Sequence, residues 1–233
     1  MTGRALGMTL IILSLLGGLV DQEFWKKKWQ TRKIGFHQNE VNTRLAKYWD
    51  KFSSDMGTVF VPLCGKSIDM VYLANLGHQI LSVELSELAI REFAAEQGLS
   101  FAIEEVENFK IFRAESYTFY CGDFFQLPVA LMQDVKYIYD RAALIALPEA
   151  MRHAYGRWIC RHVSHAKIML LSIEFDNLKI GPPFSLNQEE IEQIYGQSFQ
   201  IEKILEKSLE TTQVPHTEHI SHLIERVHFL KPL

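Results

Sequence analysis

The sequence predicts an α/β fold with a mainly parallel β-sheet and an antiparallel edge. Short, almost wholly apolar runs recur along the chain, and each ends at a small or acidic residue. Such runs are typical of parallel strands that are buried on both faces. Segments with helical periodicity, about 10 to 15 residues long, separate them, as the helices of βαβ units do. The last two β-like runs follow each other directly, which indicates antiparallel strands at one edge of the sheet.

The first half of the chain alternates between expected helices and expected strands. Trp25 and Trp29 are four residues apart, so they share one face of a short helix within residues 22–34. Ser86 is the expected N-cap of a later helix, because its side chain can accept a backbone hydrogen bond. The expected elements of this half are a helix at about 42–52, a strand at 58–62, a helix at 67–76, a strand at 79–84 and a helix from 86 to 98.

The second half begins with three short β-like runs between residues 101 and 121, which indicate antiparallel strands or one strand with an insertion. Pro148 suits the first turn of a helix, where a missing N–H leaves no hydrogen bond unmade. The remaining expected elements are a strand at 134–140, a helix at 148–163, a strand at 166–174, a helix at 187–195 and β runs at 199–205 and 219–230.

Charge and cysteine content exclude several classes of function. A formal net charge of −4 over 233 residues offers no basic face for nucleic acid. The short run Lys26–Lys28 is expected to be a solvated helix face rather than an anion contact. Cys64, Cys121 and Cys160 are far apart, so neither a disulfide framework nor a metal site is indicated. We expect a monomer in the reducing cytoplasm, with a small-molecule substrate and no stable membrane association.

The first 20 residues have a different character from the rest. Met8 to Val20 is almost wholly apolar, but a helix that spans a bilayer needs roughly 20 such residues. No clear signal-peptidase site follows this run. Three interpretations stay open for residues 1–20: a start site assigned too far upstream, a targeting or anchoring segment, and a folded N-terminal element. Residues 21–233 are expected to form one domain.

The first two expected strands end in features of a nucleotide site. The strand at 58–62 leads into Cys64-Gly65-Lys66-Ser67, and the next strand ends at Glu84, about 20 residues after the glycine turn. In open α/β sheets an acid at this place binds ribose hydroxyls. A phosphate-binding loop would need glycine where Phe60 stands, and the G-x-G-x-x-G pattern of dinucleotide sites is absent. The sequence therefore predicts a nucleoside cofactor without a diphosphate, which also disfavours an oxidoreductase.

Five motifs, in order along the chain, resemble those of thiopurine S-methyltransferases of the bacterial type. The resemblance covers residues from about 21 to the C-terminus. It implies a class I S-adenosylmethionine-dependent methyltransferase fold, which is a Rossmann-like three-layer sandwich. It also implies S-adenosyl-L-methionine as cofactor and transfer to small thiols, and bacterial members are associated with methylation of selenium and tellurium compounds. The motifs are Ile34-Gly35-Phe36-His37-Gln38, Val61-Pro62-Leu63-Cys64-Gly65-Lys66-Ser67, Val83-Glu84-Leu85-Ser86, Asp140-Arg141-Ala142-Ala143-Leu144 and Gly181-Pro182-Pro183-Phe184.

The resemblance also implies roles for individual residues. Arg141 is the expected catalytic residue, lying near the methionine part of the cofactor or near the acceptor. The expected cofactor-binding residues are Trp29, Leu63, Glu84, Asp123, Phe124 and Arg141, and the expected substrate-binding residues are Phe36, Pro183 and Phe184.

Structural alternatives stand beside these roles. Trp29 could be a core residue, Asp123 could cap a turn, and Arg141 could pair with Asp140. His37 could act as a base, although a hydrogen-bonding role at the turn fits it better.

The expected reaction needs little acid–base chemistry from the protein. An aromatic thiol or a selenol ionises readily near neutral pH, so the enzyme would mainly bring the two reactants together in line. The competing interpretation is a non-catalytic S-adenosylmethionine-binding regulator. A regulator needs no acceptor pocket, whereas Phe36 and the loop at 181–184 are expected to border one.

Overall fold

The structure is a computed structural model that describes residues 22–178, 180–210 and 220–233. The predicted N-terminal extension at 1–20 and the predicted start of the last β run at His219 lie outside the described residues.

The described strands form a nine-stranded sheet in the order β3-β4-β5-β2-β1-β6-β7-β9-β8. Its central strands β5, β2, β1, β6 and β7 are parallel, and the remaining neighbours pair antiparallel. The prediction of a mainly parallel sheet with an antiparallel edge is therefore confirmed. The strands are β1 (Thr58–Pro62), β2 (Gln79–Glu84), β3 (Ala102–Val106), β4 (Phe109–Ala114), β5 (Tyr117–Cys121), β6 (Val135–Asp140), β7 (Lys167–Phe175), β8 (Phe199–Leu209) and β9 (Leu223–Pro232).

Antiparallel strands lie at both edges of the sheet, where the sequence predicted one such edge. β5 is a parallel core strand beside β2, and only β3 and β4 form the extra antiparallel hairpin at its outer side. β3 is exposed along its whole length. The alternating polarity of the run at 101–121 could not separate the core strand from the hairpin, because both patterns have a period of two.

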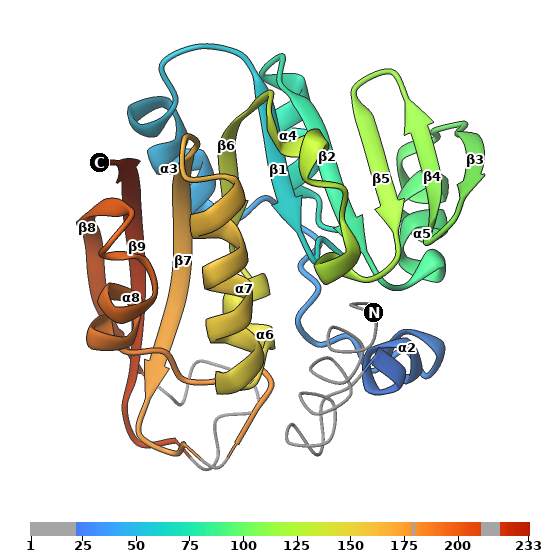
Figure 1. Ribbon diagram of the computed structural model, residues 1–233. Helices are drawn as coiled ribbons and strands as arrows, with labels where there is room; N and C mark the ends of the chain where they lie inside the picture. Colours follow the sequence, from blue (N-terminus) through green and yellow to red (C-terminus); the bar gives the residue numbers. More distant parts are fainter. Residues whose placement is uncertain (1–21, 179, 211–219) are drawn as a thin grey trace, which may run out of the picture.

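Helices cover both faces of the sheet and give it three layers (Figure 1). α3, α4 and α5 pack on one face, whereas α6, α7 and α8 pack on the other. α2 lies beyond the carboxyl ends of the parallel strands (Figure 1). The α-helices are α2 (Gln22–Gln30), α3 (Thr43–Phe52), α4 (Asp69–Asn75), α5 (Glu87–Gln97), α6 (Ala143–Ala146), α7 (Glu149–His162) and α8 (Gln188–Tyr195), with 3-10 turns at Phe124–Gln126 and Val129–Met132.

Side-chain caps begin α3 and α5, and the sequence predicted the cap of α5. Asn42 accepts hydrogen bonds from the backbone of Arg44 and Leu45 at the start of α3. Ser86 accepts one from Ala89 at the start of α5, and Gly98 ends that helix with a φ of 64°. Because the two N-caps satisfy backbone groups that the helix itself leaves unpaired, they fix where α3 and α5 begin at the carboxyl edge of the sheet.

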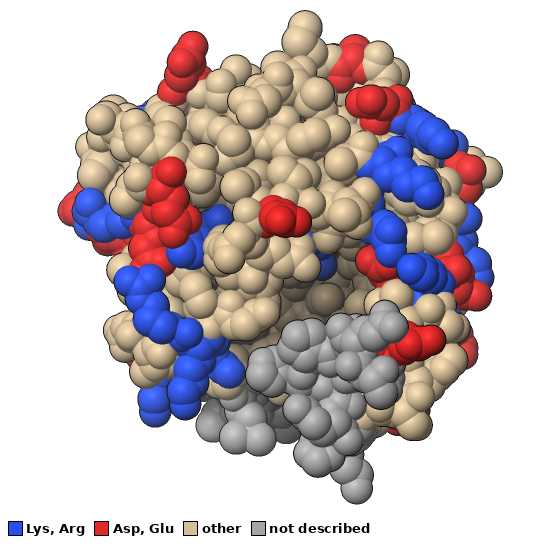
Figure 2. Space-filling model, turned by 180° about the vertical axis from the view of Figure 1, so that it is seen from behind, with Lys and Arg blue, Asp and Glu red and all other residues tan. Residues whose placement is uncertain are grey.

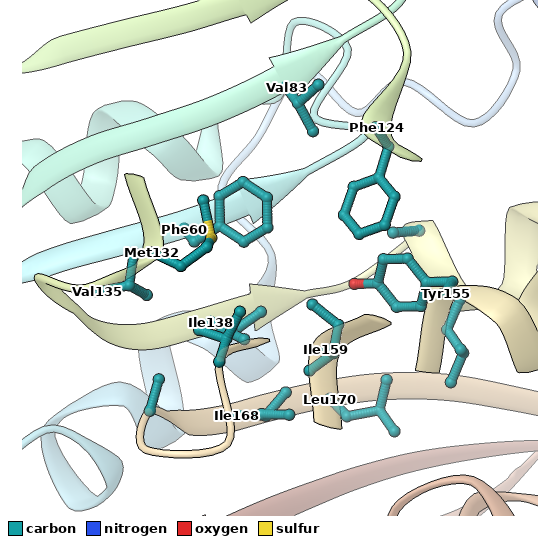
Figure 3. Close-up of a cluster of buried hydrophobic side chains, with 14 of the residues drawn as sticks. Phe60, Val83, Phe124, Met132, Val135, Ile138, Tyr155, Ile159, Ile168 and Leu170 are labelled. Carbon is teal, nitrogen blue, oxygen red and sulfur yellow. The ribbon is translucent and has the colours of Figure 1, made fainter. Parts of the chain in front are cut away.

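The core consists of two clusters of buried side chains, one on each face of the sheet. In the cluster on the side of α7, the rings of Phe60, Phe124 and Tyr155 lie close together beside Ile138 and Ile159 (Figure 3). Ring centroids are 4.8 Å apart for Phe124 and Tyr155. This packing holds the carboxyl ends of β1, β5 and β6 at fixed spacing, which is what a ligand site at that edge requires.

Candidate active site

A cavity of about 990 Å³ opens at the carboxyl ends of the parallel strands. The space-filling view shows a hollow on this side of the molecule, and the described surface above it is mostly uncharged (Figure 2). Phe184 is not among the residues that line the cavity; its backbone N–H donates to the carbonyl of Ile145 at 2.7 Å. The other eight predicted site residues do line it: Trp29, Phe36, Leu63, Glu84, Asp123, Phe124, Arg141 and Pro183.

The turn after β1 has a backbone conformation that brings it close to Trp29. Leu63 and Gly65 have positive φ values of 48° and 54°. A Cβ at Gly65 would lie 3.1 Å from the Trp29 ring, which is tighter than ordinary contact. Trp29 itself is buried, with 2% of its surface exposed. Both the core role and the site role considered for Trp29 are therefore compatible with its place, because the ring packs on the turn and also lines the cavity.

Glu84 is fixed by two backbone donors. Its Oε2 accepts the N–H of Gly65 at 2.8 Å, and its Oε1 accepts the N–H of Ser86 at 2.8 Å. Burial raises the pKa of the Glu84 carboxyl, while the backbone N–H groups partly oppose that rise. A carboxylate has about four lone-pair sites, so each oxygen keeps one for a further hydrogen-bond donor. The side chain lines the cavity and is thus pre-oriented for a pair of hydroxyl donors.

Asp123 and Phe124 continue the same wall at the end of β5. Asp123 Oδ1 accepts the N–H of Phe125 and so caps the turn, as the structural alternative proposed. Its Oδ2 accepts from the side chain of Gln22 on α2 at 3.1 Å. Phe124 points into the core toward Phe60 and contributes only its remaining surface to the cavity (Figure 3).

Arg141 is held by the segment that follows α2. Its Nη1 donates to Gln38 Oε1 at 2.7 Å, and its Nη2 donates to the carbonyl of Phe36 at 3.2 Å. Nη1 also lies 3.4 Å from the fully buried carboxylate of Asp69. The guanidinium therefore connects the end of β6 to the Phe36 turn, and it faces the cavity between them.

The neighbouring carboxylate is not the partner of Arg141. Asp140 accepts from the Tyr155 hydroxyl at 2.8 Å and from the N–H of Leu144 at 3.2 Å. Burial raises the pKa of Asp140 to about 6, although the hydrogen bonds that its carboxylate accepts act to lower that pKa. The considered pairing of Arg141 with Asp140 is thus replaced by a longer-range pairing with Asp69.

Lys66 and His37 lie away from the large cavity. Lys66 pairs with Glu92 at 3.1 Å and with Glu96 at 2.5 Å, so its ammonium is already compensated. His37 borders a small adjoining cavity of about 50 Å³ together with Arg141. Burial is the main cause that lowers the pKa of the His37 imidazole, and the charge of Lys66 adds to it.

The sequence did not predict the residues of the remaining cavity wall. Arg44 donates to Glu225 Oε2 from two nitrogens, at 2.8 Å and 2.5 Å, and Glu225 lines the cavity together with Asn42. The carboxyl end of the predicted strand at 166–174 was the signal available for the β7 residues, because strand ends at this edge border ligand sites. The apolar lining on this side comes from Ile145, Leu147, Met151, Leu171, Ile173, Phe175, Ile180 and Leu223, with Ser172 among them.

The described residues hold no group of three or more His, Cys, Asp or Glu side chains placed to bind a metal ion. Within those same residues, no helix has both the length and the apolar character needed to cross a bilayer.

The strand order, the glycine turn and the cavity-lining carboxylate of Glu84 agree with a class I S-adenosylmethionine-dependent methyltransferase fold. The fold is similar to that of a methyltransferase of this cofactor type from Anabaena variabilis, with a TM-score of 0.63, 14% identity, and coverage of 92% of this chain and 96% of the other. It is also similar to the N-terminal domain of EvdMO1 with SAH (S-adenosylhomocysteine) bound, with a TM-score of 0.57, 13% identity, and coverage of 92% and 98%.

Sequence comparison gives the family. Residues 20–232 match the family "Thiopurine S-methyltransferase (TPMT)". The thiopurine S-methyltransferase of Pseudomonas fluorescens is 41% identical over 187 residues, covering 79% of this chain and 86% of that protein. The chain belongs to the thiopurine S-methyltransferase family, and it is a methyltransferase whose cofactor is S-adenosylmethionine.

Proposed function

We propose that this enzyme methylates the sulfur of small aromatic or heterocyclic thiols, thiopurines among them. The observation that carries the proposal is the continuity of the cavity from Glu84, past Arg141, to the apolar wall of β7 and Pro183. Its volume of about 990 Å³ is at the upper end of ordinary ligand pockets, which leaves room for a flat acceptor beside the cofactor. The named activity of the relatives agrees with an acceptor of this kind.

The residues divide the cavity into a cofactor half and an acceptor half. Trp29, Leu63, Asp123 and Phe124 would enclose the nucleoside, and Glu84 would accept its ribose hydroxyls. S-adenosylmethionine, when bound, supplies a methyl group on a sulfonium sulfur. That sulfur becomes a neutral thioether when the methyl carbon forms its new C–S bond to the acceptor sulfur. The residues of the chain orient the acceptor sulfur for that displacement and exclude water from it.

Arg141 would favour the ionised acceptor. Its guanidinium faces the cavity while Gln38 and Phe36 fix its position, so the positive charge is pre-oriented toward the acceptor sulfur. The acceptor gives up its proton to solvent before transfer, because an aromatic thiol ionises near neutral pH. Phe36, 38% exposed, would cover the acceptor edge, with Pro183 bordering it from the opposite loop.

The broader setting follows from the same proposal. We place residues 21–233 in one catalytic domain that acts as a monomer in the cytoplasm. Selenium and tellurium compounds would be further acceptors, which would give the enzyme a part in detoxification and metalloid resistance.

The test is a methyl-transfer assay with the purified full chain, labelled S-adenosylmethionine, and thiophenol, 6-mercaptopurine, selenite and tellurite as acceptors. Transfer to a thiol supports the proposal and ranks the acceptors. Tight cofactor binding by calorimetry without transfer to any acceptor would instead support the non-catalytic regulator.

A further inference from the structure

Ser172 is a buried serine whose hydroxyl has no partner among the described residues. It lies on β7, is 2% exposed, and lines the large cavity. Other serines in the core do have partners: Ser82 donates to Met70 Sδ at 3.3 Å, and Ser86 caps α5. Because an unpaired buried hydroxyl destabilises a fold, one that is kept at a cavity wall calls for an explanation, and a hydrogen bond to a bound ligand is one.

The strand order puts Ser172 on the acceptor side of the cavity. The residues proposed for the nucleoside come from the turns after β1, β2 and β5 and from α2, whereas β7 lies beyond β6 in the sheet. The pairing of β6 with β7 ends at Asp140 and Leu170, so the next residues of β7 extend past the end of β6. Ser172 therefore reaches the half of the cavity into which Arg141 faces from the end of β6.

Polar groups are scarce in this half. Leu171, Ile173 and Phe175 of the same strand line it, and the Glu225 carboxylate that also borders it is already paired with Arg44. In an apolar pocket, one unpaired polar group fixes the orientation of a ligand that can bond to it.

We propose that Ser172 orients heterocyclic thiol acceptors by donating a hydrogen bond to the ring nitrogen next to the carbon that bears the sulfur. The inference rests on the proposed function and narrows its substrate class. An ionised thiol of this type shares its negative charge between sulfur and ring nitrogen, and either atom can attack a methyl donor. A hydrogen bond to nitrogen occupies that lone pair and leaves sulfur as the nucleophile. Ser172 is thus a positioning residue that selects both the acceptor and the methylated atom.

A matched pair of acceptors tests the inference, because 2-mercaptopyridine and thiophenol differ by one ring atom. In Ser172→Ala, we expect kcat/KM for 2-mercaptopyridine to fall about 3- to 10-fold, the effect of one neutral hydrogen bond. For thiophenol, kcat/KM of the variant should stay within about twofold of the wild-type value, since this acceptor has no ring nitrogen that could bond to Ser172. The proportion of N-methylated product from 2-mercaptopyridine should rise. Ser172→Thr, which keeps the hydroxyl, should restore both properties.

Ser82→Ala is the control, because it removes a buried hydroxyl from β2 of the same sheet at a residue outside the cavity lining. It should not discriminate between the two acceptors. The melting temperature of Ser172→Ala should equal or exceed that of the wild type, since no folded-state hydrogen bond is lost. Equal losses for both acceptors, or no loss for either, would overturn the inference.

Direct binding separates this inference from the proposed function. Calorimetry measures the affinity of each acceptor for the chain saturated with S-adenosylhomocysteine, so it does not depend on turnover. If the wild type methylates neither thiol, the proposed function fails, while a selective loss of 2-mercaptopyridine affinity in Ser172→Ala would still support the role of Ser172. An unchanged affinity ratio would refute it.

Discussion

Replacement of Glu84 by glutamine should weaken cofactor binding without removing the side chain. The carboxylate accepts backbone N–H groups from Gly65 and Ser86 at 2.8 Å each and faces the cavity. Glutamine has one acceptor oxygen and no charge, so a charge-assisted bond to a ribose hydroxyl is lost. Such bonds contribute about 1.5 to 3 kcal/mol, which corresponds to roughly 10- to 150-fold in Kd.

Calorimetry with S-adenosylhomocysteine and with its 2′,3′-dideoxy analogue separates a ribose contact from a general distortion of the turn. Glu84→Gln should weaken binding of the first ligand and change that of the second little. Glu87→Gln is the control, since Glu87 pairs with Arg91 and Lys110 away from the cavity lining. Equal losses for both ligands would show that Glu84 acts only through the turn, and the ribose role would be wrong.

The same contact predicts a dependence on pH. Burial raises the pKa of Glu84 in the free protein, and hydroxyl donors stabilise the charged form. Cofactor binding therefore releases a proton, and wild-type affinity should increase as pH rises through the raised pKa of Glu84. Titrations in buffers of different ionisation enthalpy would reveal that proton, which Glu84→Gln should not release.

Three further predictions concern the neighbouring residues. Arg141→Ala should lower kcat for thiols about 10- to 100-fold, the size of losing a charge contact in the transition state, and an unchanged kcat on every thiol would contradict its role. The folded-state pKa of Asp140, about 6, lies above the ordinary value of 3.8, so its protonation stabilises the fold fully below pH 3.8, and that stabilisation is lost as pH rises through 6. Urea unfolding from pH 4 to 7 should therefore show wild type losing about 2 kcal/mol relative to Asp140→Asn, whereas parallel curves would refute the raised pKa. Gly65→Ala should lower both the melting temperature and the cofactor affinity, because a Cβ there meets the Trp29 ring at 3.1 Å on a backbone with φ 54°, and unchanged values would show that the turn adapts.

Much of the fold could be predicted because its local signals are strong. The strand at 79–84 and the helices capped by Asn42 and Ser86 agree with the structure to within a residue or two. The short helix α6 was not predicted, since four residues without a side-chain cap leave little pattern. The assignment of β5 to the parallel core was also missed, because strand order depends on packing between distant segments and not on local alternation.

In the site, too, features that depend on local sequence could be predicted, whereas contacts between distant segments could not. Eight of the nine predicted residues line one cavity, because the ends of parallel strands meet at one edge of the sheet. The partners of Arg141 were not predictable, since Gln38 and Asp69 lie 103 and 72 residues away in sequence. Ser172 belongs to no motif, and the role proposed for it depends on its hydroxyl having no partner among the described residues, which only the folded structure reveals.

The β3–β4 hairpin at the outer edge has a consequence for how the molecule behaves in a crowded solution. A sheet extended by two strands ends in a row of unpaired backbone groups, and exposed Ile103 and Val106 make that row attractive to another molecule. Glu104 and Glu105 lie between those residues on β3, within 3.9 Å and 3.3 Å of basic groups on β4. A second copy that added its own β3 in register would bring like charges together, so the free edge resists the growth of intermolecular sheets.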